Sequence, residues 1–321
     1  MKKQAPPFAA LNLTNPMNPM NPAQPHNVMQ NLIFSAGDRS QASMAAMPSI
    51  ASAKTAHFTP GQPGHAVLEV PDLSTLAGMI AALKASAKPA KKKAKLVTLM
   101  GIVLDESGSM GNGCAQTMKG YNDALETLRP SAEEIGCRIT QVSFASQANV
   151  MAKDVQVKHI VPLSRETYNP MGGTALFDTV AGVVQMLLAH PLAQDDNTSV
   201  LLSITTDGDD TASTTWKTRG MAEFRALMQA VSANERWSVA LAGPDDKLRE
   251  FADLMCVAPE NVAAFKPDSV QSRAHASDAG IHAMSAYSTL RASGMKKMDM
   301  LYAGTVANVS AMAILNQDKA S

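Results

Sequence analysis

The sequence predicts an α/β fold in which a doubly wound, mostly parallel central sheet is covered by helices on both faces. Two continuous apolar runs, at residues 96–104 and 199–205, indicate strands buried on both sides, because a half-exposed strand would alternate apolar and polar residues. Segments with apolar residues three and four positions apart alternate with such strands beyond residue 96. This alternation is typical of a Rossmann-like sheet.

The first half of the expected domain supplies a central strand and a hairpin. After the strand at 96–104, residues 114–128 carry one apolar stripe and are expected to form a helix. Strands at 138–144 and 150–160 are separated by a short polar connection, which indicates a hairpin and therefore one antiparallel edge strand. Residues 174–190 again have helical spacing.

The second half repeats the alternation of strand and helix. Each expected strand is a short apolar run, and each expected helix carries an apolar residue every three or four positions. The expected elements are strands at 199–205, 237–242 and 262–265, and helices at 216–232, 247–256 and 269–290.

Four parts of different composition follow one another along the chain. The first is rich in Pro, Asn and Met, and it cannot bury enough apolar surface to fold alone. The second contains a short amphipathic helix at 72–87, which could dock on the main domain or on another subunit. We expect an extended or disordered arm at 1–65, the short helix and a Lys-rich linker at 66–95, the α/β domain at 96–295 and an apolar C-terminal tail at 296–321.

The charge is unevenly distributed although the net charge is zero. Ten basic and three acidic residues precede Leu96, which gives the arm and linker a charge of +7 and the remainder −7. Five lysines lie within residues 88–95, where a solvated linker is the favoured interpretation and contact with RNA, lipid headgroups or an acidic surface is the alternative. Nucleic acid is disfavoured as a partner, because the domain is acidic and aromatic residues make up only 4% of the chain.

Cysteine usage and hydropathy indicate the compartment. Three widely spaced cysteines without a Cys-x-x-Cys pair disfavour both zinc and a disulfide framework. No segment approaches the roughly 18 apolar residues of a membrane span, and the first residues lack a signal-peptide pattern. We therefore expect a soluble protein that is cytoplasmic or incorporated in a virion or other particle.

Three short motifs place oxygen-bearing side chains where predicted strands end and helices begin. They are Asp105-Glu106-Ser107-Gly108-Ser109, Gly172-Gly173-Thr174 and Thr206-Asp207-Gly208. Ligands of open α/β sheets bind at the carboxyl ends of the strands, so these side chains could converge there. Two carboxylates and three hydroxyls suit a hard cation, with Mg²⁺ favoured and Mn²⁺ or Ca²⁺ as alternatives.

The three motifs together resemble the metal-ion-dependent adhesion site (MIDAS) of the von Willebrand factor A (VWA) family, of the bacterial or phage type, over roughly residues 96–266. The resemblance implies that Asp105, Ser107 and Ser109 hold the metal directly or through water. It implies direct binding by Thr174 when the site is engaged, and binding by Asp207 through water. Gly108 allows a tight turn, and Gly172 and Gly173 let the backbone bring Thr174 close to the ion.

The neighbouring acidic residues are expected to have other roles. Glu106 occupies the variable position of the first motif and is expected to point to solvent. For Asp209 and Asp210 a solvated loop is the favoured interpretation. The alternatives are hydrogen bonds to the metal ligands and repulsion of an acidic partner.

The sequence is compatible with several functions. The first is a non-enzymatic interaction module that binds an Asp or Glu of a partner protein through the cation. The resemblance implies settings such as an adaptor for an AAA+ ATPase or a subunit of a larger assembly. The alternative is a structural subunit of a virion or particle that uses the arm and tail for contacts. An enzyme is not expected, since the nucleotide-binding, hydrolase and phosphatase motifs are absent from the sequence.

Overall fold

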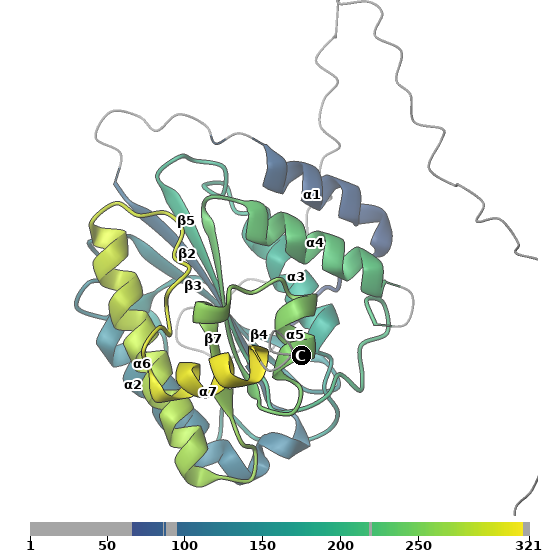
Figure 1. Cartoon of the computed structure of the whole chain (residues 1–321). Coiled ribbons are helices and arrows are strands. Elements are labelled where there is room, and N and C mark those ends of the chain that lie inside the picture. The colour runs from purple at the N-terminus through teal and green to yellow at the C-terminus, as the bar shows by residue number, and fades with distance from the viewer. Residues whose placement is uncertain (1–65, 86, 88–94, 218–219, 317–321) are drawn as a thin grey trace, which may run out of the picture. The chain divides into compact units, whose positions relative to one another are not determined.

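A computed structural model describes residues 66–85, 87, 95–217 and 220–316, and within them a seven-stranded sheet forms the centre of the fold (Figure 1). The strand order is β1-β4-β3-β2-β5-β6-β7, and within the described residues β4 alone runs in the direction opposite to the other strands. The predicted antiparallel strand is therefore confirmed, although the short β1 lies outside it at the edge. The strands are β1 (Ala66–Val67), β2 (Val97–Asp105), β3 (Cys137–Phe144), β4 (Ala148–Gln156), β5 (Thr198–Thr205), β6 (Trp237–Pro244) and β7 (Val262–Phe265).

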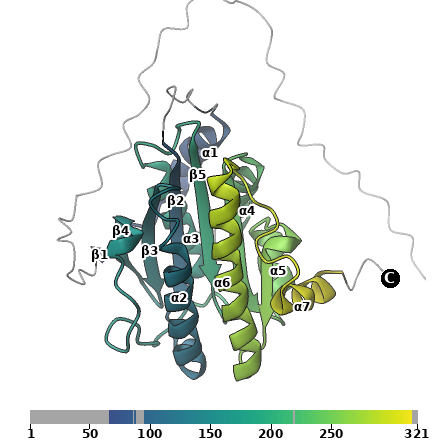
Figure 2. The same ribbon diagram turned by 90° about the vertical axis from the view of Figure 1, so that its left-hand side faces the viewer.

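Helices cover both faces of this sheet, which makes the fold doubly wound as predicted. On one face α2 and α6 lie side by side (Figure 2), and on the other α3 and α4 pack against the strands. The two apolar layers form separate core clusters, one on each face. The helices are α1 (Leu76–Lys84), α2 (Cys114–Leu128), α3 (Leu176–Leu188), α4 (Met221–Ala233), α5 (Leu248–Leu254), α6 (Val270–Ala292) and α7 (Val306–Leu315).

The predicted start of α4 at residue 216 is wrong, since the helix begins at Met221. Trp216 instead lies in the preceding loop with its indole fully buried. Its ring packs edge-on against Phe224 of α4, and its Nε1 donates to the carbonyl of Pro71 at 2.8 Å. The tryptophan is therefore held by long-range partners that helical spacing does not detect.

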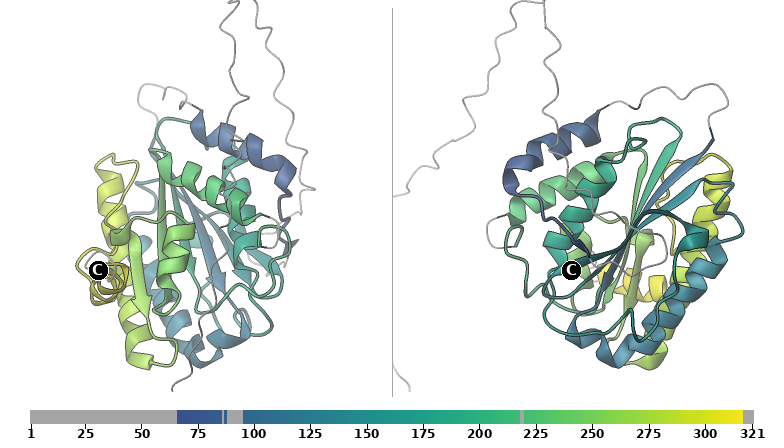
Figure 3. Two further views of the ribbon diagram at one scale, coloured as in Figure 1. Left: turned by 45° about the vertical axis from the view of Figure 1, so that its right-hand side comes forward. Right: turned by 180° about the vertical axis from the view of Figure 1, so that it is seen from behind.

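The segment before the domain docks on the domain itself. Helix α1 lies alongside α4 (Figure 3) and also contacts α3. It follows a single turn capped by Asp72, whose carboxylate accepts from the Ser74 N–H. Asn234 donates to the Leu83 carbonyl near the end of α1. The structure thus selects the first of the two docking alternatives for this helix. The arm at 1–65 and the lysines at 88–93 lie outside the described residues.

The C-terminal segment also packs on the domain. Asn308 of α7 donates to the carbonyls of Pro259 and Val262 at 2.9 and 2.8 Å, which fixes the helix beside the edge strand β7. Tyr302 and Ala307 belong to the core cluster under α2 and α6. No helix in the described part of the chain has both the length and the apolar character needed to cross a membrane.

A charged cluster around Asp154 lies at the end of the β3–β4 hairpin that is away from the turn. Arg138 of β3 and His190, which follows α3, both bond to the Asp154 carboxylate. Partial burial acts to raise the pKa of this carboxyl, but the hydrogen bonds from His190 and Arg138 outweigh it and lower the pKa to about 2. Asp154 has a left-handed φ of 55° beside an irregularity in the strand register. Such a bulge disrupts regular pairing near the edge of the sheet.

Candidate metal centre

The predicted site lies between β2 and β5, where the order of strands in the sheet reverses. The chain leaves β2 toward α2 on one face and leaves β5 toward α4 on the other. Ligand sites of doubly wound sheets form at such a switch point, at the carboxyl ends of the strands. Asp105 is the last residue of β2, and Asp207 follows the end of β5 by two residues. Leu104 and Thr205 are register partners, so both loops start side by side.

Hydrogen bonds join the first and third motifs directly. Ser107 Oγ lies 3.0 Å from Ser109 Oγ, which in turn donates to Asp207 Oδ1 at 2.6 Å. The Asp105 carboxylate accepts from the Ser107 N–H at 2.7 Å and from Thr206 Oγ1 at 2.6 Å. Four of the five predicted ligands therefore form one continuous cluster.

Thr174 reaches the same cluster from the loop before α3. A Cβ built on Gly208 would lie 3.2 Å from Ser109 Oγ and 3.7 Å from Thr174 Oγ1, so the two hydroxyls flank this glycine. The Thr174 backbone is fixed by Thr211, whose Oγ1 accepts from the Thr174 N–H at 2.9 Å. The structure thus brings all five predicted side chains together.

Close backbone contacts explain the glycines of the predicted site. Gly108 donates to the Gly172 carbonyl at 3.1 Å, which joins the first two motifs. Gly172 has a φ of +75°, a left-handed conformation that favours glycine. The next residue, Gly173, donates to Ser146 Oγ at 2.8 Å. A side chain at Gly172 would also crowd Ser146, at 2.9 Å from its hydroxyl oxygen.

Burial controls the electrostatics of the cluster. Asp105 is fully buried, and this burial raises the pKa of its carboxyl to about 6, against the lowering effect of hydrogen bonds from Thr206 and Ser107. The described residues contain no basic side chain paired with Asp105. A buried carboxylate of this kind gains strongly from a nearby cation.

Arg273 is a residue of the site that the sequence analysis missed. From the first turns of α6, its guanidinium donates to Asp207 Oδ2 at 2.7 Å and to the Pro267 carbonyl at 2.8 Å. It lies over the Phe265 ring at 5.3 Å and is only 6% exposed. A basic residue near a helix N-terminus is unfavourable because it opposes the helix dipole. Its position in the first turn of a predicted helix is therefore the sequence signal by which Arg273 could have been found. Arg273 neutralises one of the two carboxylates of the cluster.

Two of the three neighbouring acidic residues differ from their expected roles. Glu106 was predicted to point to solvent. Its carboxylate instead accepts from the Asn169 N–H at 2.6 Å and so binds the loop before Gly172. Asp209 is exposed, as expected, and pairs with Lys247. The solvated loop expected for Asp210 is wrong. This residue is buried, because its carboxylate accepts from the N–H groups of Phe177 and Ser213 and caps the start of α3.

The donor set fits a hard divalent cation and does not fit zinc. Two carboxylates and three hydroxyls supply only oxygen, the ligand type preferred by Mg²⁺, Mn²⁺ and Ca²⁺. Within the described ranges no group of three or more His, Cys, Asp or Glu side chains is placed to hold a metal. Any cation here would therefore depend on the hydroxyls and on groups from outside the chain.

The fold and the cluster define a doubly wound α/β domain with an oxygen-rich site at its switch point. The sequence matches no protein-family model and no curated protein. Similar solved structures include a von Willebrand factor type A protein from Catenulispora acidiphila, with 17% identity and a TM-score of 0.40 over 60% of this chain and 43% of that one. The PilB minor pilin from Streptococcus sanguinis has 11% identity and a TM-score of 0.41 over 63% of each chain.

Manganese-loaded TRAP protein from Plasmodium vivax is a third similar structure. It has 15% identity and a TM-score of 0.37 over 58% of this chain and 74% of that one. This chain spans less than two thirds of the length of the first two structures. Since all three TM-scores are below 0.5, the fold assignment depends on the strand order and helix placement described above.

Proposed function

We propose that this chain is a protein-interaction domain that binds a carboxylate of a partner through a divalent cation. Asp105, Ser107, Ser109, Thr174 and Asp207 would hold the cation. The observation that carries the proposal is their convergence at the switch point, around a fully buried Asp105 with no cationic partner among the described residues. The likeness of the three motifs to a VWA MIDAS supports the same function.

The charge of the cluster favours an anionic partner. Arg273 offsets the charge of Asp207, so a divalent cation would face only one uncompensated carboxylate, that of Asp105. The occupied site would then carry a net positive charge, and the chain would supply fewer anionic ligands than the cation can accept. A partner's Asp or Glu side chain can complete the coordination of such an ion, and the remaining positions are filled by water.

The cation is proposed to be Mg²⁺, with Mn²⁺ and Ca²⁺ as alternatives of the same ligand preference. In this proposal the chain binds and does not catalyse. Its partner would be another protein, such as an AAA+ ATPase or a neighbouring subunit of an assembly, in the cytoplasm or within a particle.

Metal binding is tested first, with luminescence of Tb³⁺ as a probe of hard-cation sites and competition by Mg²⁺. We expect saturable binding by the intact protein and its loss in Asp105→Ala. The matched control is Asp209→Ala, which removes an exposed aspartate of the neighbouring loop and should leave binding unchanged. Equal binding by the intact protein and Asp105→Ala would overturn the proposed site.

Partner binding is tested by a pull-down from native lysate in Mg²⁺ and in EDTA, with mass spectrometry of the retained proteins. Partners that are retained only in Mg²⁺, and lost with Asp105→Ala, are the expected result. Equal retention under both conditions would mean that the partner contacts a different surface.

Exposed apolar side chains near the C-terminus favour the second candidate, a structural subunit of a larger assembly. Met300, Val306 and Val309 are 66%, 58% and 62% exposed on the segment that carries α7. If neighbouring subunits cover them, Val306→Ser with Val309→Ser should lower the mass measured by light scattering. An unchanged mass would count against this candidate.

A further inference from the structure

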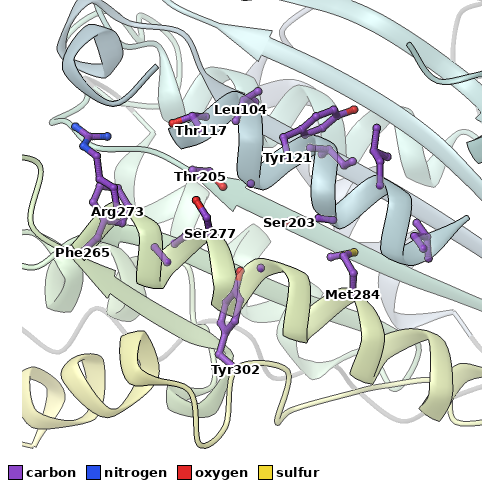
Figure 4. Close-up of a pocket in the computed structure, with 18 of the residues that line it drawn as sticks. Leu104, Thr117, Tyr121, Ser203, Thr205, Phe265, Arg273, Ser277, Met284 and Tyr302 are labelled. Atoms are coloured by element: carbon purple, nitrogen blue, oxygen red, sulfur yellow. The ribbon is translucent and has the colours of Figure 1, made fainter. Parts of the chain in front are cut away.

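A cavity of about 120 Å³ lies between the central strands and helices α2 and α6 (Figure 4). Its floor is formed by β2, β5 and β6, and its roof by the two helices. Three floor residues, Ile102, Ser203 and Thr205, are half-buried although two helices cover their face of the sheet. Part of the surface of these three side chains is therefore left uncovered by the helices.

Small side chains create this cavity. The floor includes Ala242 and Ser203, and the roof includes Ala276 and Gly280. A Cβ on Gly280 would meet no atom within 4 Å, whereas one on Gly120 would lie 2.5 Å from Ser277 of the opposite helix. Helices α2 and α6 thus touch at Gly120, and the cavity results from missing side-chain volume and not from separated helices. Close-packed interiors rarely leave such a space.

Four hydroxyl groups that line the cavity have no hydrogen-bond partner among the described residues. They belong to Thr117 of α2, Ser203 and Thr205 of β5, and Tyr302. Tyr302 is only 3% exposed, and burial raises the pKa of its phenol, which keeps it neutral and able to donate. Figure 4 labels these four side chains among those that line the pocket. None of these four oxygens is among the fully buried atoms that lack a partner, so they keep some accessible surface and are available to a bound molecule or to water.

The rest of the lining is apolar and nearly without charge. Met100, Leu125, Phe265 and Met284 supply its walls. Arg273 is the one charged residue among those that line the cavity in the described structure, and its guanidinium is already bonded to Asp207 and to a backbone carbonyl. An anionic ligand would therefore have to compete with that buried ion pair, whereas a neutral one would not.

We propose that this cavity binds a small neutral amphipathic molecule, with a single ring or a short chain and one or two hydroxyl or carbonyl groups. An engineered apolar cavity of roughly 150 Å³ in another protein accepts benzene, so a one-ring molecule is the right size. The hydroxyls of Tyr302 and Thr205 would bond its polar group, and the methionine and leucine side chains would contact its apolar part. None of the five proposed metal ligands lines the cavity, although Arg273, which pairs with Asp207, does.

Phenol is the probe that matches this chemistry, and benzene is its apolar counterpart. We expect phenol to bind the full-length protein saturably by isothermal titration calorimetry and to raise its melting temperature. Gly280→Leu, which fills the cavity, should weaken phenol binding at least tenfold. Gly78→Leu is the matched control, because Gly78 is also a helical glycine with no atom within 4 Å of a built Cβ and does not line the cavity.

A second variant keeps the test valid if Gly280→Leu fails to fold. Tyr302→Phe removes one hydroxyl and should weaken phenol binding about 3- to 10-fold, as expected for one hydrogen bond, while leaving benzene binding unchanged. Absence of saturable phenol binding would mean that the cavity holds water only, and the proposal would be wrong. Equal phenol affinity in the intact protein and in folded Gly280→Leu would also overturn it.

Discussion

Replacement of Asp178 by alanine is expected to destabilise the protein more than loss of any exposed acidic residue. Asp178 lies in the first turn of α3 and is only 5% exposed. Its carboxylate accepts from the backbone N–H groups of Thr214, Thr215 and Trp216 at 2.9 to 3.3 Å, and also from Thr214 Oγ1. One side chain therefore holds the loop that follows Asp207.

The size of the effect follows from these hydrogen bonds. Each bond to a charged acceptor contributes about 1.5–3 kcal/mol, and a buried donor left without a partner costs a similar amount. The three donors are consecutive and can relax together, so their effects are not additive. We expect Asp178→Ala to lower the free energy of unfolding by about 4 kcal/mol, near the upper end for single substitutions.

Urea denaturation followed by circular dichroism measures this loss. With a slope of about 2–3 kcal/mol per molar urea, the midpoint should fall by roughly 1.3–2 M. Asp178→Asn keeps part of the hydrogen bonding and should lose about half as much free energy of unfolding. The control is Asp123→Ala on α2, where an exposed pair with Lys119 is lost and the change should stay below about 0.5 kcal/mol. A loss below about 1.5 kcal/mol for Asp178→Ala would refute the reasoning.

Three further outcomes follow from features of the described structure. Arg273→Gln should raise Tb³⁺ affinity about tenfold, because binding no longer competes with the buried ion pair to Asp207; an unchanged or lower affinity in the luminescence titration would contradict this. The Asp154 pKa of about 2 lies below the ordinary value of 3.8, so the stability it provides is present above about pH 4 and is lost as the pH falls toward 2. Over this pH range the urea midpoint should fall less in Asp154→Asn than in the unsubstituted protein. Asparagine is chosen because it tolerates the left-handed backbone conformation of this position. Gly136→Ala should cost more than about 2 kcal/mol in the same assay, since its φ is +58° and the added Cβ would lie 2.1 Å from a backbone oxygen. Gly294→Ala, with positive φ but open space, should cost about 1 kcal/mol, and equal losses would argue against the steric explanation.

Local patterns were sufficient to predict most of the fold. The helix at 114–128 and the strand at 262–265 have the predicted bounds, because apolar spacing and strand burial are properties of short segments. The start of α4 was not predictable in this way. Trp216 is fixed by Pro71, which is 145 positions earlier in the chain, and no local signal reports that contact.

At the candidate site, too, short sequence motifs predicted some residues, while contacts between distant parts of the chain were not predicted. Each of the five predicted side chains stands at or near a strand or helix end, and motif order was enough to predict that they converge. The partners of those ligands were not predicted. Arg273 comes 66 residues after Asp207, and the burial of Asp210 depends on a helix start more than 30 residues before it. The charges around a site are therefore harder to infer from sequence than the side chains that converge there.

The docking of the first helix on the domain also affects when the protein can fold during its synthesis. Pro71 and Leu83 leave the ribosome before the residues that bind them, Trp216 and Asn234, which follow 145 and 151 positions later. At about 5–20 residues per second, translation separates these partners by roughly 7–30 s. During that interval the apolar face of α1 has no binding surface on the domain, because the residues that form it have not yet been synthesised.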